Sequence, residues 1–174
     1  MRRPTRDCLC TSRVQYGTAD AVSSFHRLPL VQELWVHLKA AKKHTFVPIH
    51  EIAAYLGPAK SMGMIGLHAF TGNDNVSSFH SIGKSTALKM MLGYEGSEDA
   101  FITLSNGNLE DARPKLINFV IAMYTKSKMY KSLTDCRRAL YAKFQRPMEN
   151  VPPTEDALCQ HMRRASYQAQ APVS

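Results

Sequence analysis

Residues 68–91 read HAFTGNDNVSSFHSIGKSTALKMM and carry much of what the sequence says about fold and function. An apolar segment ends in this stretch, and a helix candidate then opens with Lys84, Ser85 and Thr86. The first amides of a helix have no partners within the helix, and the helix dipole makes that end positive. The stretch therefore predicts a phosphate-binding turn. Its residues are Ile82, Gly83, Lys84, Ser85 and Thr86.

The sequence GKST at 83–86 is not a P-loop. That motif needs a glycine five residues before Gly83, where this chain has Ser78, and no clear buried strand leads into it. His50-Glu51 is not a zinc-protease pair, because the position four residues after the histidine is Ala54. The seven histidines show no metal-ligand spacing elsewhere, so we interpret them as surface or locally hydrogen-bonded side chains.

The composition is that of a globular protein with a basic excess. The chain has 174 residues, of which 44% are hydrophobic and 21% charged, so it is long enough for one domain with a core. A net charge of +8 favours an anionic partner such as nucleic acid. Residues 113–146 contain nine lysines and arginines and one acidic residue. In residues 95–111, by contrast, every charged residue is acidic. The basic segment is either a phosphate-facing surface or the solvated side of packed helices.

The sequence contains no clear membrane or secretory signal. The basic opening MRRPTRDCLCTS lacks an apolar run, and the best apolar run, residues 116–124, is half the length of a membrane span. Four cysteines do not make a disulfide framework in a chain of this size. We expect an intracellular protein that does not bind membranes and lies in the nucleus rather than the cytoplasm.

The first half of the chain gives mixed signals. Leucines recur at helical spacing in residues 30–43, which predicts a helix. Residues 44–49 contain β-branched side chains and a proline, so we expect a strand or an extended link. Residues 50–57 predict a short helix that is stopped by Gly57-Pro58.

The second half is more clearly helical. Helices are predicted over residues 84–92 and 132–144 from their apolar stripes. Pro114 suits the first position of a helix that contains the apolar run behind it. A last helix is predicted within residues 152–167, with Thr154 as its N-cap.

Four motifs occur in order along the chain: ELWV at 33–36, VPIHEIAAYLG at 47–57, HAFTGNDNVSSF at 68–79 and PPTEDALCQHMRRASYQA at 152–169. The stretch 68–91 resembles the helix-two-turn-helix region of the flap-endonuclease and XPG-like nucleases of the PIN-like superfamily. The ordered set of four motifs is more closely similar to uncharacterised, transposon-associated animal proteins of that type.

The resemblance implies a mainly α fold. It would be the helical C-terminal portion of an α/β PIN-like nuclease domain whose N-terminal sheet is largely missing. On this reading, residues 1–29 form a basic, irregular arm. Residues 30–169 form the truncated domain, and residues 170–174 form a frayed tail.

The resemblance also implies a metal site, of which this chain keeps a part. The family's Gly-Cys-Asp is Gly72-Asn73-Asp74 here, so Asp74 is the family-type metal acid. Asp20 is the nearest counterpart of an upstream acidic strand. Ser81 replaces the first glycine of the Gly-x-Gly turn and should resist a positive φ if the turn needs one. Cleavage with two metals needs several carboxylates, so we expect at most weak Mg²⁺ or Mn²⁺ binding and assign no catalytic residue.

Three functions remain open from the sequence. The favoured one is a non-catalytic, transposon-derived remnant that binds the backbone of DNA or RNA through its helix-two-turn-helix. The second is a structure-specific nuclease that depends on divalent metal, alone or completed by a partner chain that supplies the missing carboxylates. The third is a protein-interaction fragment that does not bind nucleic acid. Without the resemblance, Asp74 would be a turn-forming or helix-capping acid.

Overall fold

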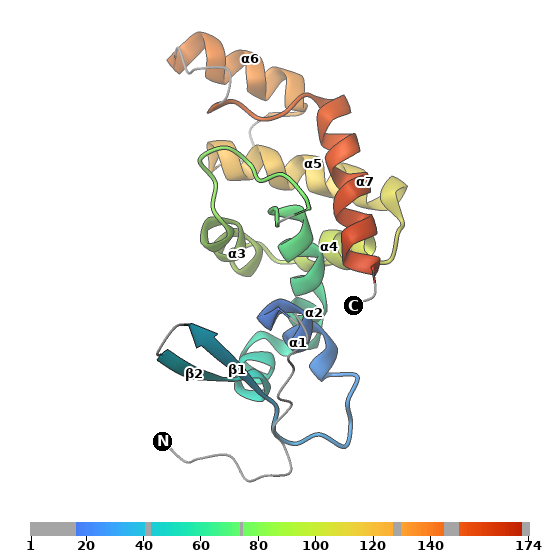
Figure 1. The fold of residues 1–174 in the computed structure, drawn as a ribbon. Helices are drawn as coiled ribbons and strands as arrows, with labels where there is room; N and C mark the ends of the chain where they lie inside the picture. The colour runs from blue at the N-terminus through green and yellow to red at the C-terminus, as the bar shows by residue number, and fades with distance from the viewer. Residues whose placement is uncertain (1–16, 41–42, 74, 127–129, 145–149, 172–174) are drawn as a thin grey trace. The chain divides into compact units, whose positions relative to one another are not determined.

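The computed structural model describes most of the chain and is mainly helical (Figure 1). The described residues are 17–40, 43–73, 75–126, 130–144 and 150–171. They form two compact units, an N-terminal one that ends at Ile65 and a larger one formed by Gly66–Ala171. Helix α2 (Ile49–Phe70) contributes residues to both units.

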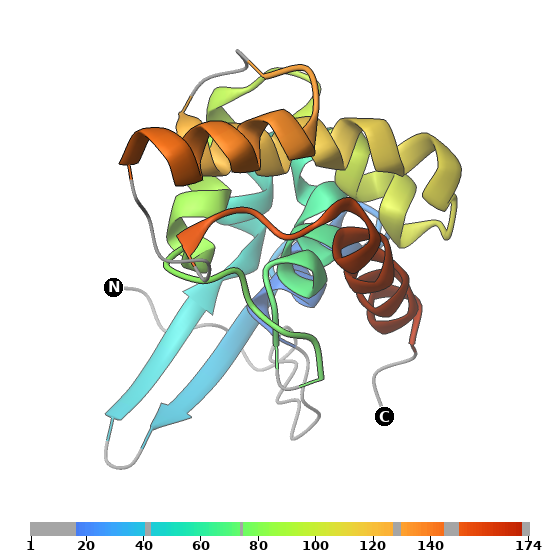
Figure 2. The ribbon, with the colours of Figure 1, turned by 90° about the horizontal axis from the view of Figure 1, so that it is seen from above.

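A two-stranded hairpin and helices form the N-terminal unit. Its elements are α1 (Thr18–Phe25), β1 (Trp35–Ala40), β2 (Lys43–Pro48) and the first part of α2. The two strands pair antiparallel, with Val36 opposite Val47, and Figure 2 shows them as adjacent arrows. Val22, Val36 and Ile49 are the buried centre of this unit's core.

The helix predicted over residues 30–43 is wrong, because β1 occupies most of that segment. The leucine spacing suggested a helical apolar face, but the leucines are not buried together. Leu30 is 94% exposed and Leu38 is 45% exposed, whereas Val36 is buried against the core. The strand expected at 44–49 is confirmed by β2.

The irregular arm predicted over residues 1–29 is wrong for residues 18–25, which form α1. The carboxylate of Asp20 accepts a hydrogen bond from the Gly17 N–H at 3.0 Å and so closes the first turn. Val22 then packs into the core of the N-terminal unit. Short-range capping and one apolar anchor therefore stabilise a helix that its composition did not indicate.

Helix α2 is broken at Gly57, which has φ 75° and ψ 169°. Pro58 follows it, and a proline is tolerated where a helical segment starts. The predicted stop at Gly57-Pro58 is confirmed as a break, but the chain resumes as a helix at once and continues to Phe70. A Cβ at Gly57 would meet nothing within 4 Å, so the backbone conformation rather than space calls for glycine.

The larger unit is a set of packed helices. Its elements after α2 are α3 (Lys84–Gly93), α4 (Ser97–Ser105), α5 (Leu109–Thr125), α6 (Leu133–Phe144) and α7 (Glu155–Gln170). Helices α4, α5 and α7 pack on one another, and α6 lies beside α5 (Figure 1). A Cβ at Gly66 would lie 2.3 Å from the Phe101 carbonyl oxygen, so only glycine permits this close approach.

The three helices predicted over 84–92, 132–144 and 152–167 are confirmed by α3, α6 and α7. The hydroxyl of Thr154 caps α7 as expected, accepting a hydrogen bond from the Ala157 N–H at 3.3 Å. Helix α7 extends to Gln170, the first residue of the expected tail. Residues 172–174 of that tail lie outside the described residues.

The helix start predicted at Pro114 is wrong. Helix α5 begins earlier, at Leu109, and Asn108 caps it by accepting a hydrogen bond from the Asp111 N–H at 3.3 Å. Proline is therefore inside the helix, where it cannot donate to the carbonyl four residues back. Helix α4 was also not predicted, because its segment is short and carries acids.

Candidate nucleic-acid interface

The loop between α2 and α3 holds the predicted phosphate-binding turn. Ser81 adopts φ 60°, so this turn does need a residue in the left-handed region. The Ile82 N–H donates to the Phe79 carbonyl at 3.2 Å, and Gly83 then enters α3 in an extended conformation. A serine in the left-handed region is strained, and it is held here by the surrounding loop.

Helix α3 presents its N-terminus without a side-chain cap. Its first turn contains no acid, and Gly83 has no side chain that could accept from the first amides. Ser85 and Thr86 are exposed, and a Cβ at Gly83 would meet nothing within 4 Å. Among the described residues, nothing crowds the Gly83 Cβ position, and the helix dipole would favour an anion at this end.

Lys84 is the charged residue of this turn. Its Nζ lies 3.1 Å from Nδ1 of His68, in the last turn of α2. A lysine ammonium can only donate, so Nδ1 of His68 is the acceptor and the ring proton is on Nε2. The contact keeps the positive charge beside the start of α3.

Gly72 and Asn73 shape the first part of the loop. The Asn73 side-chain oxygen accepts hydrogen bonds from the N–H groups of Asn75 and Val76 at 3.0 and 2.9 Å. Gly72 has φ 97°, and a Cβ there would lie 2.8 Å from the Ser78 backbone. These two residues therefore have a structural role in the turn.

His161 of α7 anchors the loop to the helices. Its Nε2 lies 2.7 Å from the Phe70 carbonyl oxygen and donates to it, so Nδ1 is free to accept from the Ser77 hydroxyl at 3.4 Å. The imidazole ring also lies against Phe70 and Phe79, with ring centres 5.2 and 4.9 Å away. Burial lowers the pKa of His161, which favours the neutral ring that these hydrogen bonds require.

Helix α7 contributes further residues beside the α2–α3 loop, and the sequence did not lead us to predict them. The Asn75 side-chain amide donates to Gln168 at 3.1 Å. Arg164 is exposed and close enough to His161 for its charge to lower the histidine pKa slightly. The segments 68–79 and 152–169 were noted only as consecutive motifs, and in the fold they touch one another. The presence of both motifs in the sequence was the one signal that could have suggested a contact between α7 and the loop.

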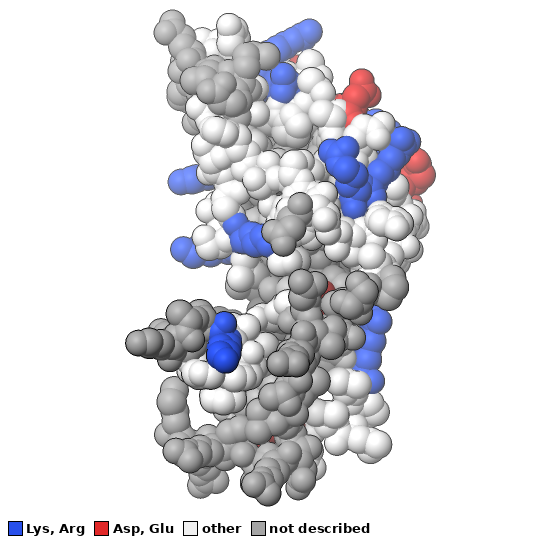
Figure 3. Space-filling model, viewed as in Figure 1, with Lys and Arg blue, Asp and Glu red and all other residues white. Residues whose placement is uncertain are grey.

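The basic segment 113–146 is used partly for packing. Arg113 pairs with Glu155 at 2.7 Å, Lys115 pairs with Asp99, and Arg137 donates to the Pro152 carbonyl. The exposed bases among its described side chains are Lys115, Lys126, Lys131 and Arg138. On the face shown in Figure 3, the lysine and arginine side chains lie in several separate groups. Part of the charge in this segment is therefore structural.

Of the two expected metal ligands, Asp20 lies within the described residues. Asp74 lies outside the described residues, and Asp20 belongs to the N-terminal unit, where its carboxylate caps α1. Within the described ranges, no group of three or more His, Cys, Asp or Glu side chains could hold a metal ion.

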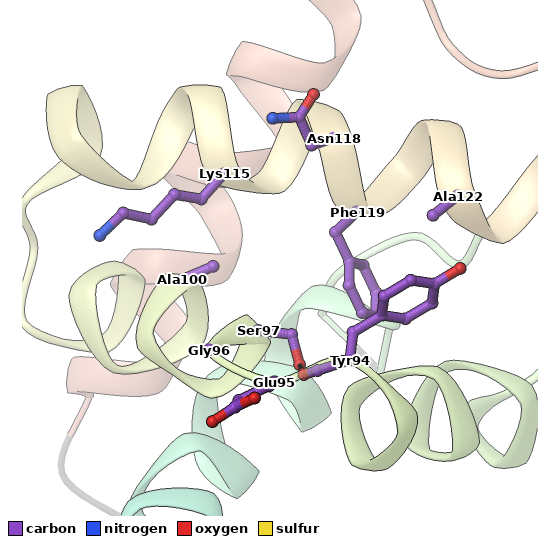
Figure 4. Close-up of a pocket in the computed structure, with 9 residues that line it drawn as sticks. All are labelled: Tyr94, Glu95, Gly96, Ser97, Ala100, Lys115, Asn118, Phe119 and Ala122. Atoms are coloured by element: carbon purple, nitrogen blue, oxygen red, sulfur yellow. Dashed lines mark hydrogen bonds between the residues drawn. The ribbon is translucent and has the colours of Figure 1, made fainter. Parts of the chain in front are cut away.

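A small pocket lies between α5 and the start of α4 (Figure 4). Its volume is about 180 Å³, below the range of about 300–1,000 Å³ that is typical of small-molecule sites. The lining residues are Tyr94, Glu95, Gly96, Ser97, Ala100, Lys115, Asn118, Phe119 and Ala122. Lys115, its cationic group, is already paired with Asp99, so we assign the pocket no ligand.

No protein-family model, curated protein or solved structure matches the chain. None of the helices in the described ranges has both the length and the apolar character needed to cross a lipid bilayer. The described residues define a mainly helical protein in which β1 and β2 form a small hairpin.

Proposed function

We propose that the chain is a non-catalytic nucleic-acid-binding module that holds a backbone phosphate at residues 82–86. The observation that carries the proposal is the uncapped, open N-terminus of α3 with Lys84 beside it. A nuclear location belongs to the same proposal, since the expected ligand is DNA or RNA.

The chemistry of this turn suits a phosphate. The α3 dipole and the ammonium of Lys84 both favour a negative charge, and the hydroxyls of Ser85 and Thr86 can donate to phosphate oxygens. Such contacts position a protein on the backbone but carry no base information. The net charge of +8 adds long-range attraction to any nucleic acid. Binding is therefore expected to be sequence-independent and sensitive to salt.

The loop is held in a defined shape by its contacts with α7, and this supports a binding role. The contacts of His161 with Phe70 and of Asn75 with Gln168 hold the first part of the loop before any ligand arrives. A preformed turn loses less conformational entropy on binding than a flexible one. Arg164, exposed on α7, is a second base that the phosphate backbone could reach if it passes this loop.

The test is a binding titration of the full chain against single- and double-stranded DNA and RNA at several salt concentrations. We expect affinity to fall steeply with salt, and Lys84→Glu to weaken binding about equally for all sequences. The salt slope should flatten by about one ion, because one phosphate contact is lost.

Lys89→Glu is the matched control, because it makes the same charge change further along α3. It should reduce affinity less than Lys84→Glu at equal salt. Equal effects of the two variants would show that only net charge matters and would remove the turn from the proposal. Absence of salt-sensitive binding by the unaltered chain would favour a protein-interaction role instead.

A further inference from the structure

The hairpin brings two histidines together that are seven positions apart. His37 of β1 lies directly opposite Phe46, and Lys39 lies opposite His44. Side chains alternate between the two faces of a strand, so these four side chains belong to the same face. His37 and His44 are therefore diagonal neighbours, within reach of one another. The helix predicted over residues 30–43 gave no indication that His37 and His44 would be neighbours.

The two imidazole rings meet through their nitrogens. Nε2 of His37 is 2.8 Å from Nδ1 of His44, while the ring centres are 5.0 Å apart and the planes differ by 17°. Because the nitrogens are much closer than the ring centres, the rings meet edge to edge. Phe46 lies against His37, with ring centres 4.7 Å apart, and supports its orientation.

We propose that His37 and His44 form a two-histidine site for a divalent late transition metal, with Ni²⁺ and Cu²⁺ fitting best. Neutral imidazole is a preferred ligand of these ions, whereas Mg²⁺ and Mn²⁺ prefer oxygen. The site is independent of the proposed nucleic-acid binding and lies in the N-terminal unit. Water molecules would complete the coordination of the metal.

The nitrogen spacing favours a square geometry over a tetrahedral one. Two nitrogens 2.8 Å apart, each about 2.05 Å from one ion, subtend about 86° at the metal. Neighbouring ligands in square-planar or octahedral complexes are close to this angle. A tetrahedral zinc site needs the same nitrogens about 3.3 Å apart. The present spacing therefore suits Ni²⁺ and Cu²⁺ with the least movement.

Metal binding needs one proton to move and both rings to turn. In the hydrogen-bonded pair, one ring donates its N–H to the other ring. A metal needs a lone pair on both facing nitrogens, so the donor ring passes that proton through water to its second nitrogen. The pair releases no net proton, and both rings turn until their lone pairs meet at the ion. Lys39, opposite His44, opposes the positive ion and limits the affinity.

The experiment is a calorimetric titration of the full chain with Ni²⁺, which does not oxidise thiols. We expect His37→Ala and His44→Ala each to weaken the strongest site by about tenfold or more, because a single imidazole cannot chelate. His80→Ala, which removes another exposed histidine, should leave the affinity unchanged. Equal Ni²⁺ affinity in the unaltered chain and both hairpin variants would overturn the proposal.

A second variant keeps both histidines and guards against loss of the hairpin. Lys39→Glu removes the opposing charge and adds an oxygen ligand beside His44, so Ni²⁺ should bind about two- to fivefold more tightly. Circular dichroism checks that each variant is folded. Unchanged or weaker binding by a folded Lys39→Glu chain would also count against the site.

Discussion

Lys84 and His68 join the two helices of the candidate interface, with the lysine Nζ 3.1 Å from the histidine Nδ1. The ammonium is thereby oriented at the start of α3. If this orientation matters for binding, the two side chains act as one unit, and removing either should have an overlapping effect. We expect the double variant His68→Ala/Lys84→Ala to bind DNA no more weakly than Lys84→Ala alone. A double-mutant cycle by fluorescence anisotropy measures this, and additive losses would mean that the pair is not coupled.

The positive φ of Gly72 makes this glycine essential for the loop. Gly72→Ala places a Cβ 2.8 Å from the Ser78 backbone, so we expect a loss of at least about 2 kcal/mol in the free energy of unfolding. Urea denaturation gives the value. Gly93→Ala is the control, because a Cβ there meets nothing within 4 Å, and its stability should be unchanged or slightly higher. Similar losses in both variants would contradict the loop geometry.

Ser81 is a strained position that glycine should relieve. Its φ of 60° disfavours any side chain, so Ser81→Gly should stabilise the chain by about 0.5–1 kcal/mol, after allowing for the greater freedom of glycine when unfolded. Ser81→Ala keeps the strain and removes only the exposed hydroxyl bond to Asn150, so its stability should change little. Thermal unfolding of the three chains compares them directly. A destabilised Ser81→Gly chain would argue against the left-handed turn.

His161 should make stability depend on pH. Its folded-state pKa is lowered by burial, so the unfolded chain binds more protons in acid. The stabilisation is fully present above about pH 6.5, the ordinary histidine pKa, and is lost as the pH falls toward the lowered value. We expect the melting temperature to fall less in His161→Gln than in the unaltered chain between about pH 7.5 and 5.5. His80→Ala should retain the original slope, and an unchanged slope in His161→Gln would refute the assignment.

The chain should not cut DNA flaps. Asp74 is the one acid that the family resemblance clearly keeps, and a single carboxylate holds Mg²⁺ weakly and cannot place a second ion. We predict no cleavage of a flap substrate with Mg²⁺ or Mn²⁺, and DNA binding that largely persists in Asp74→Ala. Cleavage by the unaltered chain that disappears in Asp74→Ala would instead make the protein a nuclease.

Local signals predicted α3, α6 and α7 well. Thr154 was read as an N-cap from its position before two acids and an apolar stripe, and the cap is present. Of the apolar stripe expected at Leu133, Cys136, Leu140 and Phe144, the first three are buried, and the Phe144 side chain lies outside the described part. These elements depend on neighbours within a few residues, which a sequence displays directly.

The strand β1 and the contacts of His161 depend on residues that are far apart in the sequence. Residues 30–43 have leucines at helical spacing, but pairing of residues 35–40 with β2 and burial of Val36 made that part a strand. The turn at 82–86 was predicted from local chemistry, whereas the role of His161 depends on a contact across most of the larger unit. A single sequence gives no measure of such contacts, so the loop's anchors and the histidine pair of the hairpin emerged only in the fold.

The hydrogen bond between His161 and Phe70 also has a consequence for the order of events during synthesis. The two residues are 91 positions apart, so the loop leaves the ribosome long before α7 exists. Until α7 docks, Ser77 and Phe79 lack the imidazole that holds them, and joining such distant segments is a slow, entropically costly step. The nascent chain is therefore expected to acquire its finished turn only after α7 has been synthesised, which delays any binding of nucleic acid until then.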